Sequence, residues 1–200
     1  MHIIYRLRGS FLHSVAAEFI NELNTEMAQL KQSFAQSDPT HAVVQSAWSE
    51  KLAVLRQNYH LKYDHILDNM NEGPAFLADA KAKRCIIESW LHLAKTDRLE
   101  IYAISVMSNH VHVLLAYAEP RGFVDIHKLF ARHKRFTATV INQLQNKKGR
   151  KVWAATVFDR DVRPGGFQNV LWYILNNPVK VGLTDDPINW NGNYVKPDLL

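Results

Sequence analysis

Two amphipathic stripes occupy the first third of this chain. Apolar residues recur at steps of three and four from residue 15 to residue 34, and a second such series runs from residue 44 to residue 59. This spacing is typical of one buried face of an α-helix. The two series are separated by Asp38-Pro39-Thr40, a sequence that ends a helix. The pattern predicts a helical hairpin over residues 11–60, as an insertion or appendage of a single domain spanning residues 1–200.

Short β-rich segments and helical segments follow one another in the rest of the chain. The expected strands span residues 2–8, 101–107, 110–117 and 152–157. The second and third of these are separated by the turn residues Ser108 and Asn109, which predicts an antiparallel hairpin. The expected helices span residues 78–95, residues 123–145 and about ten residues that end before Pro178. This order predicts an α+β fold, with helices packed on an antiparallel sheet.

The composition narrows the class of protein. Of the 200 residues, 47% are hydrophobic and 22% are charged, which excludes a disordered or low-complexity chain. A single cysteine, Cys85, excludes a disulfide framework and a cysteine-rich zinc site. The N-terminus has no secretory signal and no apolar run could span a bilayer, so we expect a cytoplasmic protein with no membrane partner. The net charge of +5 favours an anionic partner such as nucleic acid.

His110 and His112 are the first candidates for chemistry. Residues two apart in a strand share a face, so both imidazoles project together while Val111 and Val113 take the opposite, apolar face. Two neutral imidazoles on one face can bind a divalent cation and leave its other positions open. The alternative is a pair of polar residues on a half-exposed strand.

Tyr173 is the second candidate, because it lies at the edge of the apolar stripe of the last predicted helix. Asn177 follows four residues later and therefore lies on the same side. A phenol of pKa about 10 is a weak nucleophile at pH 7, so it needs a base or a metal-polarised target. The alternative is a boundary tyrosine with a half-buried ring, followed by an asparagine at a helix end.

Basic residues gather in the second half of the chain. The candidate DNA-binding residues are Lys128, Arg132, Lys134 and Arg135 on the helix over residues 123–145, and Arg160 and Arg163 before the last helix. Such a face suits a polyanion backbone, although a solvated helix face is the alternative. His133 lies on the apolar stripe of the same helix, which indicates a core histidine. Cys85 is interpreted as a small buried residue.

Two motifs together resemble the REP-associated tyrosine transposases (RAYTs), which belong to the HUH single-tyrosine transposase superfamily. The segment Val106-Met107-Ser108-Asn109-His110-Val111-His112-Val113-Leu114-Leu115 resembles the HUH strand of that family, and Tyr173-Ile174-Leu175-Asn176-Asn177-Pro178-Val179-Lys180 resembles its nucleophile helix. The resemblance covers roughly residues 60–190, and the pairing of the two motifs in this order is specific. The chain departs from the family at Ser108, where proline is usual, and at Ala154, where glutamine is frequent.

The resemblance implies a fold, a site and a reaction. The fold is a ferredoxin-like or RRM-like antiparallel sheet with helices on it. His110 and His112 hold Mg²⁺ or Mn²⁺, with Asn177 as the third ligand by its position. Tyr173 attacks a scissile phosphate and leaves a 5′-phosphotyrosine bond and a free 3′-hydroxyl. The substrates are single strands that fold into hairpins, such as repetitive extragenic palindromes, and relatives are monomers or homodimers in the bacterial cytosol or nucleoid.

Other functions stay open at this point. A hairpin-binding protein that has lost catalysis would bind the same DNA without cleaving it. A metal-dependent hydrolase would use His110 and His112 to activate water and would form no covalent adduct. A basic α+β domain with solvated histidines would bind no metal.

Overall fold

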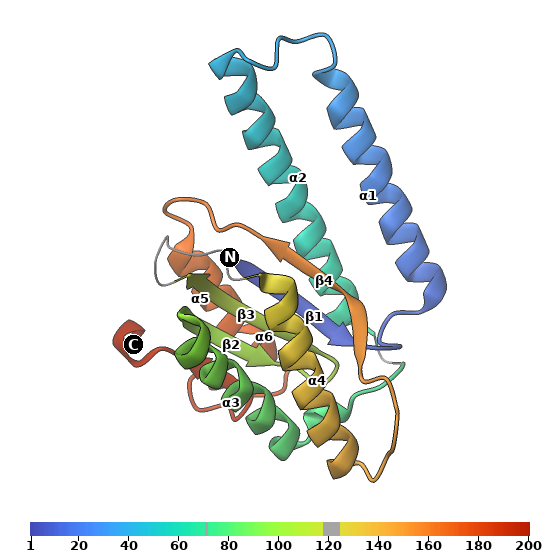
Figure 1. Ribbon diagram of the computed structural model, residues 1–200, viewed down its shortest axis with the longest axis vertical. Coiled ribbons are helices and arrows are strands. Elements are labelled where there is room, and N and C mark those ends of the chain that lie inside the picture. The colour runs from blue at the N-terminus through green and yellow to red at the C-terminus, as the bar shows by residue number, and fades with distance from the viewer. Residues whose placement is uncertain (71, 118–124) are drawn as a thin grey trace. The chain divides into compact units, whose positions relative to one another are not determined.

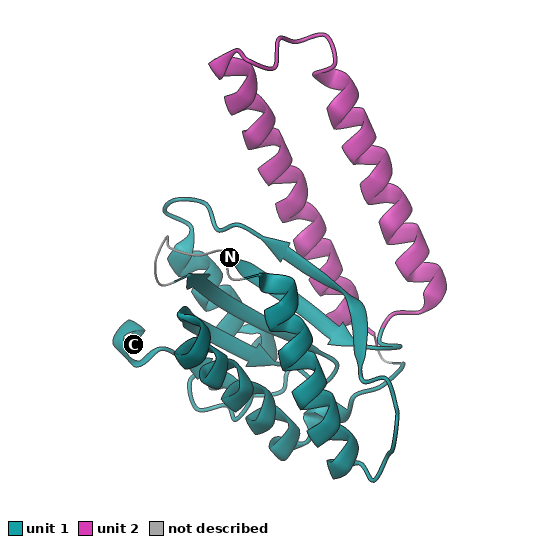
Figure 2. Cartoon of the chain, in the orientation of Figure 1, with its two compact units in different colours: residues 1–10, 72–200 teal, residues 11–71 magenta. Residues whose placement is uncertain are grey.

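The computed structural model describes residues 1–70, 72–117 and 125–200, and the chain divides into two compact units (Figure 2). Unit 1 comprises Met1–Ser10 and Glu72–Leu200, and unit 2 comprises Phe11–Asn71. Unit 2 is therefore inserted in the sequence of unit 1, directly after its first strand.

Unit 2 consists of two helices, α1 (His13–Ser33) and α2 (Ala42–Asp68) (Figure 1). The Phe19 ring of α1 packs against Tyr59 and Tyr63 of α2, with ring centroids 5.4 Å and 5.5 Å away. The Tyr59 hydroxyl donates a hydrogen bond of 2.9 Å to Glu26. The helical periodicity predicted both helices, but α2 runs past the predicted end at residue 60.

Unit 1 is an α+β sandwich built on one antiparallel sheet. Its strands, in the order β4-β1-β3-β2-β5, are β4 (Trp153–Arg160), β1 (His2–Leu7), β3 (His110–Tyr117), β2 (Leu99–Val106) and β5 (Asn193–Val195). Its helices are α3 (Ala80–Asp97), α4 (Ile126–Leu144), α5 (Phe167–Leu175) and α6 (Asn177–Lys180), with short 3₁₀ turns at η1 (Phe76–Ala78) and η2 (Pro197–Leu199). The four-strand part has the ferredoxin-like order, which confirms the predicted fold class.

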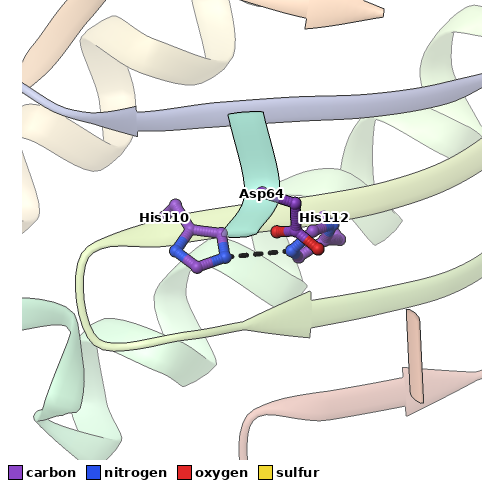
Figure 3. Close-up of side chains that lie close together, drawn as sticks. All are labelled: Asp64, His110 and His112. Atoms are coloured by element: carbon purple, nitrogen blue, oxygen red, sulfur yellow. Dashed lines mark hydrogen bonds between the residues drawn. The ribbon is translucent and has the colours of Figure 1, made fainter. Parts of the chain in front are cut away.

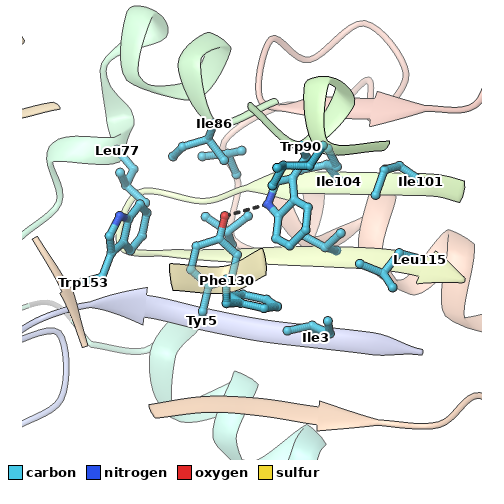
Figure 4. Close-up of a cluster of buried hydrophobic side chains, with 14 of the residues drawn as sticks. Ile3, Tyr5, Leu77, Ile86, Trp90, Ile101, Ile104, Leu115, Phe130 and Trp153 are labelled. Carbon is cyan, nitrogen blue, oxygen red and sulfur yellow. Dashed lines mark hydrogen bonds between the residues drawn. The ribbon is translucent and has the colours of Figure 1, made fainter. Parts of the chain in front are cut away.

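One face of the sheet forms the main core with α3 and α4. Alternate residues of the central strands, such as Ile3 of β1 and Leu115 of β3, point to this face and are buried with Trp90 of α3 and Phe130 of α4 (Figure 4). The inward-facing side chains of the strands and the apolar stripes of α3 and α4 thus form one apolar layer.

A hydrogen-bonded polar cluster lies inside this core. Trp90 Nε1 donates to the Tyr5 hydroxyl at 2.9 Å (Figure 4), and that hydroxyl lies 2.7 Å from His133 Nε2. The Ser89 hydroxyl lies 2.9 Å from His133 Nδ1, so both ring nitrogens have partners. His133 is 1% exposed, which confirms its interpretation as a core histidine. Burial, with a smaller contribution from the charge of Lys134, lowers the pKa of His133 to about 3.

The low pKa of His133 makes stability depend on pH. The pKa is lower in the folded chain than the ordinary 6.5, so the stabilisation is complete above pH 6.5 and is lost as the pH falls towards 3. We expect the free energy of unfolding to decrease by up to about 1.4 kcal/mol per pH unit in this window. Urea unfolding between pH 7 and pH 4 would measure a shallower decrease for His133→Gln. The exposed His127 provides the control His127→Gln, and equal slopes for wild type and His133→Gln would contradict the expectation.

Both ends of the inserted unit meet unit 1 at one tight junction. Gly73 has a φ of +104°, and a Cβ atom at this position would lie 2.8 Å from the carbonyl oxygen of Gly9. Gly9 has a φ of +86°, and its own Cβ would lie 3.7 Å from Pro74. Only glycine allows the backbone to pass this closely at residue 73. The chain therefore leaves unit 1 and returns to it at neighbouring points.

The C-terminal elements differ most from the predictions. β5 was not predicted, and it adds an edge strand to β2. Asn193 of β5 donates to the carbonyl oxygen of Leu175 at 2.8 Å, which ties this strand to the end of α5. Residues 123 and 124, which were predicted to begin a helix, lie outside the described residues. The described helix α4 is capped by Asp125, whose side chain accepts from the backbone N–H of His127 and Lys128.

Candidate active site

The second face of the sheet carries the predicted chemical residues. Alternation in the central strands places His2 of β1 and His110 and His112 of β3 on the face opposite the main core. The same face is covered by the apolar side of α5, where Leu171 and Ile174 pack on Leu114 of β3. The histidines therefore lie on a central strand beside the helix that holds Tyr173.

The two β3 imidazoles are arranged as a pair (Figure 3). His110 Nε2 and His112 Nε2 lie 3.0 Å apart, and both side chains are buried. His110 Nδ1 lies 2.6 Å from the side-chain oxygen of Asn109, which can only accept, so His110 Nδ1 carries the proton and its Nε2 has a lone pair. The third side chain in the figure, Asp64, belongs to α2 of unit 2.

The geometry of this pair fits a divalent cation. Two ligands at 90° on a cation with bonds of about 2.1 Å are separated by about 3.0 Å, which is the distance between the two Nε2 atoms. Imidazole ligands favour Mn²⁺ over Mg²⁺, because Mg²⁺ prefers oxygen ligands. His110 and His112 can therefore provide two of the ligands of such an ion.

Tyr173 of α5 lies next to these imidazoles. Its ring centroid is 6.5 Å from that of His112 and 6.2 Å from that of His2, in both cases with an edge-on geometry. Lys180 Nζ lies 3.4 Å from the centre of the Tyr173 ring, in a cation–π contact. The ring is only partly buried. The helix thus holds the ring at the histidine pair while the side chain keeps access to solvent.

Asn177 is the first residue of α6 and is fully buried. Its Oδ1 accepts a hydrogen bond of 2.8 Å from Lys180, and its Nδ2 has no hydrogen-bond partner among the described residues. Lys180 contacts both Asn177 and the Tyr173 ring, so these side chains lie on one side, as the spacing of four residues predicted. For Asn177 to serve as an oxygen ligand, its Oδ1 must exchange Lys180 for the cation.

Of the six candidate DNA-binding residues, Arg160 is the one that the sheet register brings to this face. It pairs with His2 across β1 and β4, and directly opposed residues point to the same side. Burial lowers the pKa of the Arg160 guanidinium, while the nearby Tyr173 oxygen counters part of that shift. The Nε of Arg160 is buried and has no hydrogen-bond partner in the described parts of the chain. A phosphate oxygen would satisfy this donor.

The α4 residues lie elsewhere, because α4 packs on the opposite face of the sheet. Lys128 and Arg135 are exposed there, and Arg163 is exposed beyond the end of β4. Arg132 donates to both carboxylate oxygens of Asp97, one of them at 2.9 Å. Lys134 donates to the carbonyl oxygen of Ala154 at 2.9 Å, and burial lowers its pKa to about 8. The structure therefore does not bring the α4 residues together with the histidine pair.

A family model described as IS200-like transposase matches residues 57–174. The chain belongs to this family. A solved structure described as a REP-associated tyrosine transposase bound to a REP hairpin is similar to this transposase, with a TM-score of 0.44 and 17% sequence identity. The similarity covers 60% of this chain and 67% of that chain. No curated protein matches the chain. Within the described residues of this transposase, no helix is long and apolar enough to cross a bilayer.

Three residues of this transposase that the sequence reasoning did not select lie at the site: His2, Asn109 and Lys180. Asn109 precedes the first histidine and was interpreted only as a turn residue. His2 reaches the site through the pairing of β1 with β3, in which it lies opposite Leu114. Lys180 follows Asn177 by three residues, a helical spacing that could have identified it.

Proposed function

We propose that this IS200-like transposase cleaves and rejoins single-stranded, hairpin-forming DNA through a covalent bond to Tyr173. The observation that carries the proposal is the Tyr173 ring at 6.5 Å from His112, beside a pair of imidazoles with the ligand spacing of a divalent cation. Hairpin DNA, such as a REP-like palindrome, is the substrate class that the resemblance to the REP-associated tyrosine transposases implies. The net charge of +5 is compatible with that polyanion.

The reaction exchanges one phosphodiester bond for another. The Tyr173 hydroxyl loses its proton and its oxygen attacks the phosphorus. The bond between the phosphorus and the 3′-oxygen breaks, and the departing 3′-oxygen takes up a proton. A 5′-phosphotyrosine and a free 3′-hydroxyl result, so rejoining needs no external energy source. When bound, Mn²⁺ or Mg²⁺ would polarise the scissile phosphate and orient it.

The side chains of this site have separate roles in the proposal. His110 and His112 hold the cation through Nε2, and Asn177 supplies an amide oxygen as third ligand. Arg160 binds a phosphate oxygen on the strand that approaches Tyr173. The apolar packing of α5 on the sheet fixes the position of the phenol relative to the imidazoles.

A cleavage assay on a 5′- and 3′-labelled hairpin oligonucleotide with Mn²⁺ tests the function. We expect a labelled protein band that resists denaturation and contains the fragment on the 3′ side of the broken bond, so that only the 3′ label stays with the protein. Turnover without such an adduct would support a hydrolase, and tight hairpin binding without cleavage would support a silent DNA-binding protein. Either result would contradict the proposal.

The exposed basic residues of α4 have a separate test. The double variant Lys128→Glu/Arg135→Glu should weaken binding to all DNA sequences and should make the dependence of log K on log salt shallower by about one unit per lost phosphate contact. Fluorescence anisotropy with a hairpin at several salt concentrations would measure both effects. Lys81→Glu/Lys95→Glu on α3 is the control with the same charge change. Unchanged affinity and slope in the α4 variant would place the DNA elsewhere.

A further inference from the structure

His2 contacts His112, one of the two candidate metal ligands, at the ring nitrogen that faces away from His110. Its Nε2 lies 3.1 Å from His112 Nδ1, and both side chains are fully buried. The His2 and His112 ring centroids are 5.4 Å apart. His112 Nε2, on the other side of the same ring, faces His110. His2 is therefore placed to act on the nitrogen of His112 that is turned away from the cation.

Hydrogen bonds connect Asn109, His110, His112 and His2 in a row. If all three imidazoles are neutral, the donor and the acceptor of each bond are determined. The Asn109 oxygen accepts from His110 Nδ1, so His110 Nε2 must accept from His112 Nε2. His112 Nδ1 then has a lone pair and must accept from His2 Nε2. With this direction of the hydrogen bonds, His112 carries its proton on the nitrogen that a cation needs.

Cation binding requires His112 to change tautomer. Its Nε2 must lose the proton and present a lone pair, and Nδ1 must gain a proton and donate it. The group that faces Nδ1 has to change from donor to acceptor at the same time. An imidazole can do so, because its Nε2 is a donor in one neutral tautomer and an acceptor in the other.

We propose that His2 is a positioning residue for the metal site, which orients His112 and accepts a hydrogen bond from its protonated Nδ1 when His112 Nε2 binds a divalent cation. This inference rests on the metal site of the proposed function. Partners of this kind fix the tautomer and the ring orientation of a ligating histidine, and their loss costs about 10- to 100-fold in metal affinity. No contact between His2 and the cation or the DNA is required.

The test compares two substitutions by Mn²⁺ binding alone, without DNA. His2→Leu keeps an apolar side chain in the sheet but removes the partner of His112 Nδ1, so we expect Mn²⁺ to bind about 10- to 100-fold more weakly. His2→Gln carries an amide that can either donate or accept, so we expect an affinity within about threefold of wild type. Electron paramagnetic resonance of free Mn²⁺ gives these affinities, and thermal unfolding checks the fold of each variant.

A second measurement reports the tautomer directly. Long-range ¹H–¹⁵N correlation spectra of the metal-free wild type should show His112 protonated at Nε2, and the His2→Leu spectrum should show a mixture of tautomers. Unchanged Mn²⁺ affinity in His2→Leu, or a wild-type His112 protonated at Nδ1, would overturn the inference. If His2→Leu does not fold, the wild-type spectrum still decides, because it reports which nitrogen of His112 carries the proton. Because neither measurement involves cleavage, a failure of the proposed DNA reaction would be seen separately.

Discussion

Tyr173→Phe should abolish the covalent protein–DNA product, with a loss of at least about 10³-fold in the rate of adduct formation. The substitution removes only the attacking oxygen. The phenylalanine ring keeps the edge contacts with His2 and His112 and the place of the tyrosine on α5, so folding and hairpin binding should be unchanged. Denaturing gels with a labelled hairpin and Mn²⁺ would measure the adduct, and anisotropy would measure binding.

A matched control separates this effect from the general loss of a phenol. Tyr117 lies at the end of β3 and is 44% exposed, so Tyr117→Phe should form adduct at the wild-type rate. Peptide mapping of the wild-type adduct should locate the DNA on Tyr173. A covalent product in the Tyr173→Phe variant, or DNA mapped to another tyrosine, would refute the assignment of the nucleophile.

His112→Ala should have the second large effect. It removes one of the two nitrogens with the 3.0 Å ligand spacing, and the remaining His110 cannot hold the cation with the same affinity. We expect Mn²⁺ binding to weaken by more than about 100-fold, since even the loss of a partner behind a ligand costs 10- to 100-fold. The adduct should disappear at micromolar Mn²⁺, and hairpin binding should be mostly retained because phosphate contacts come from basic side chains.

The control for this variant is another histidine of the same chain. His127 is exposed on α4, which packs on the other face of the sheet, so His127→Ala should keep wild-type Mn²⁺ affinity and adduct yield. Adduct formation by His112→Ala at the same Mn²⁺ concentration as wild type would show that the β3 pair is not the metal site.

Local periodicity predicted the parts of the site that lie within single elements. The period of two in residues 110–117 placed both imidazoles on one face, and the helical spacing placed Tyr173 and Asn177 on one side. The apolar stripe of α4 identified His133 as a core residue. In each case the signal comes from residues within one turn or one strand, where spacing determines direction.

Contacts between distant segments could not be predicted in the same way. His2 reaches His112 only because β1 pairs with β3 in a particular register, and no spacing in the sequence specifies that register. Arg132 and Lys134 were selected by charge, but Asp97 of α3 and the backbone of β4 engage them. β5 is three residues long and has too short a pattern to be distinguished from a loop.

The close approach of Gly9 and Gly73 bears on how this fold can form. β1 must pair with β3 across about a hundred intervening residues, and closing so long a loop costs entropy and slows folding. α1 and α2 form by local contacts, and an antiparallel helix pair returns the chain close to where it left. Once that pair has formed, the inserted unit acts as one long turn between Gly9 and Gly73, and the ferredoxin-like unit folds as though its sequence were much shorter.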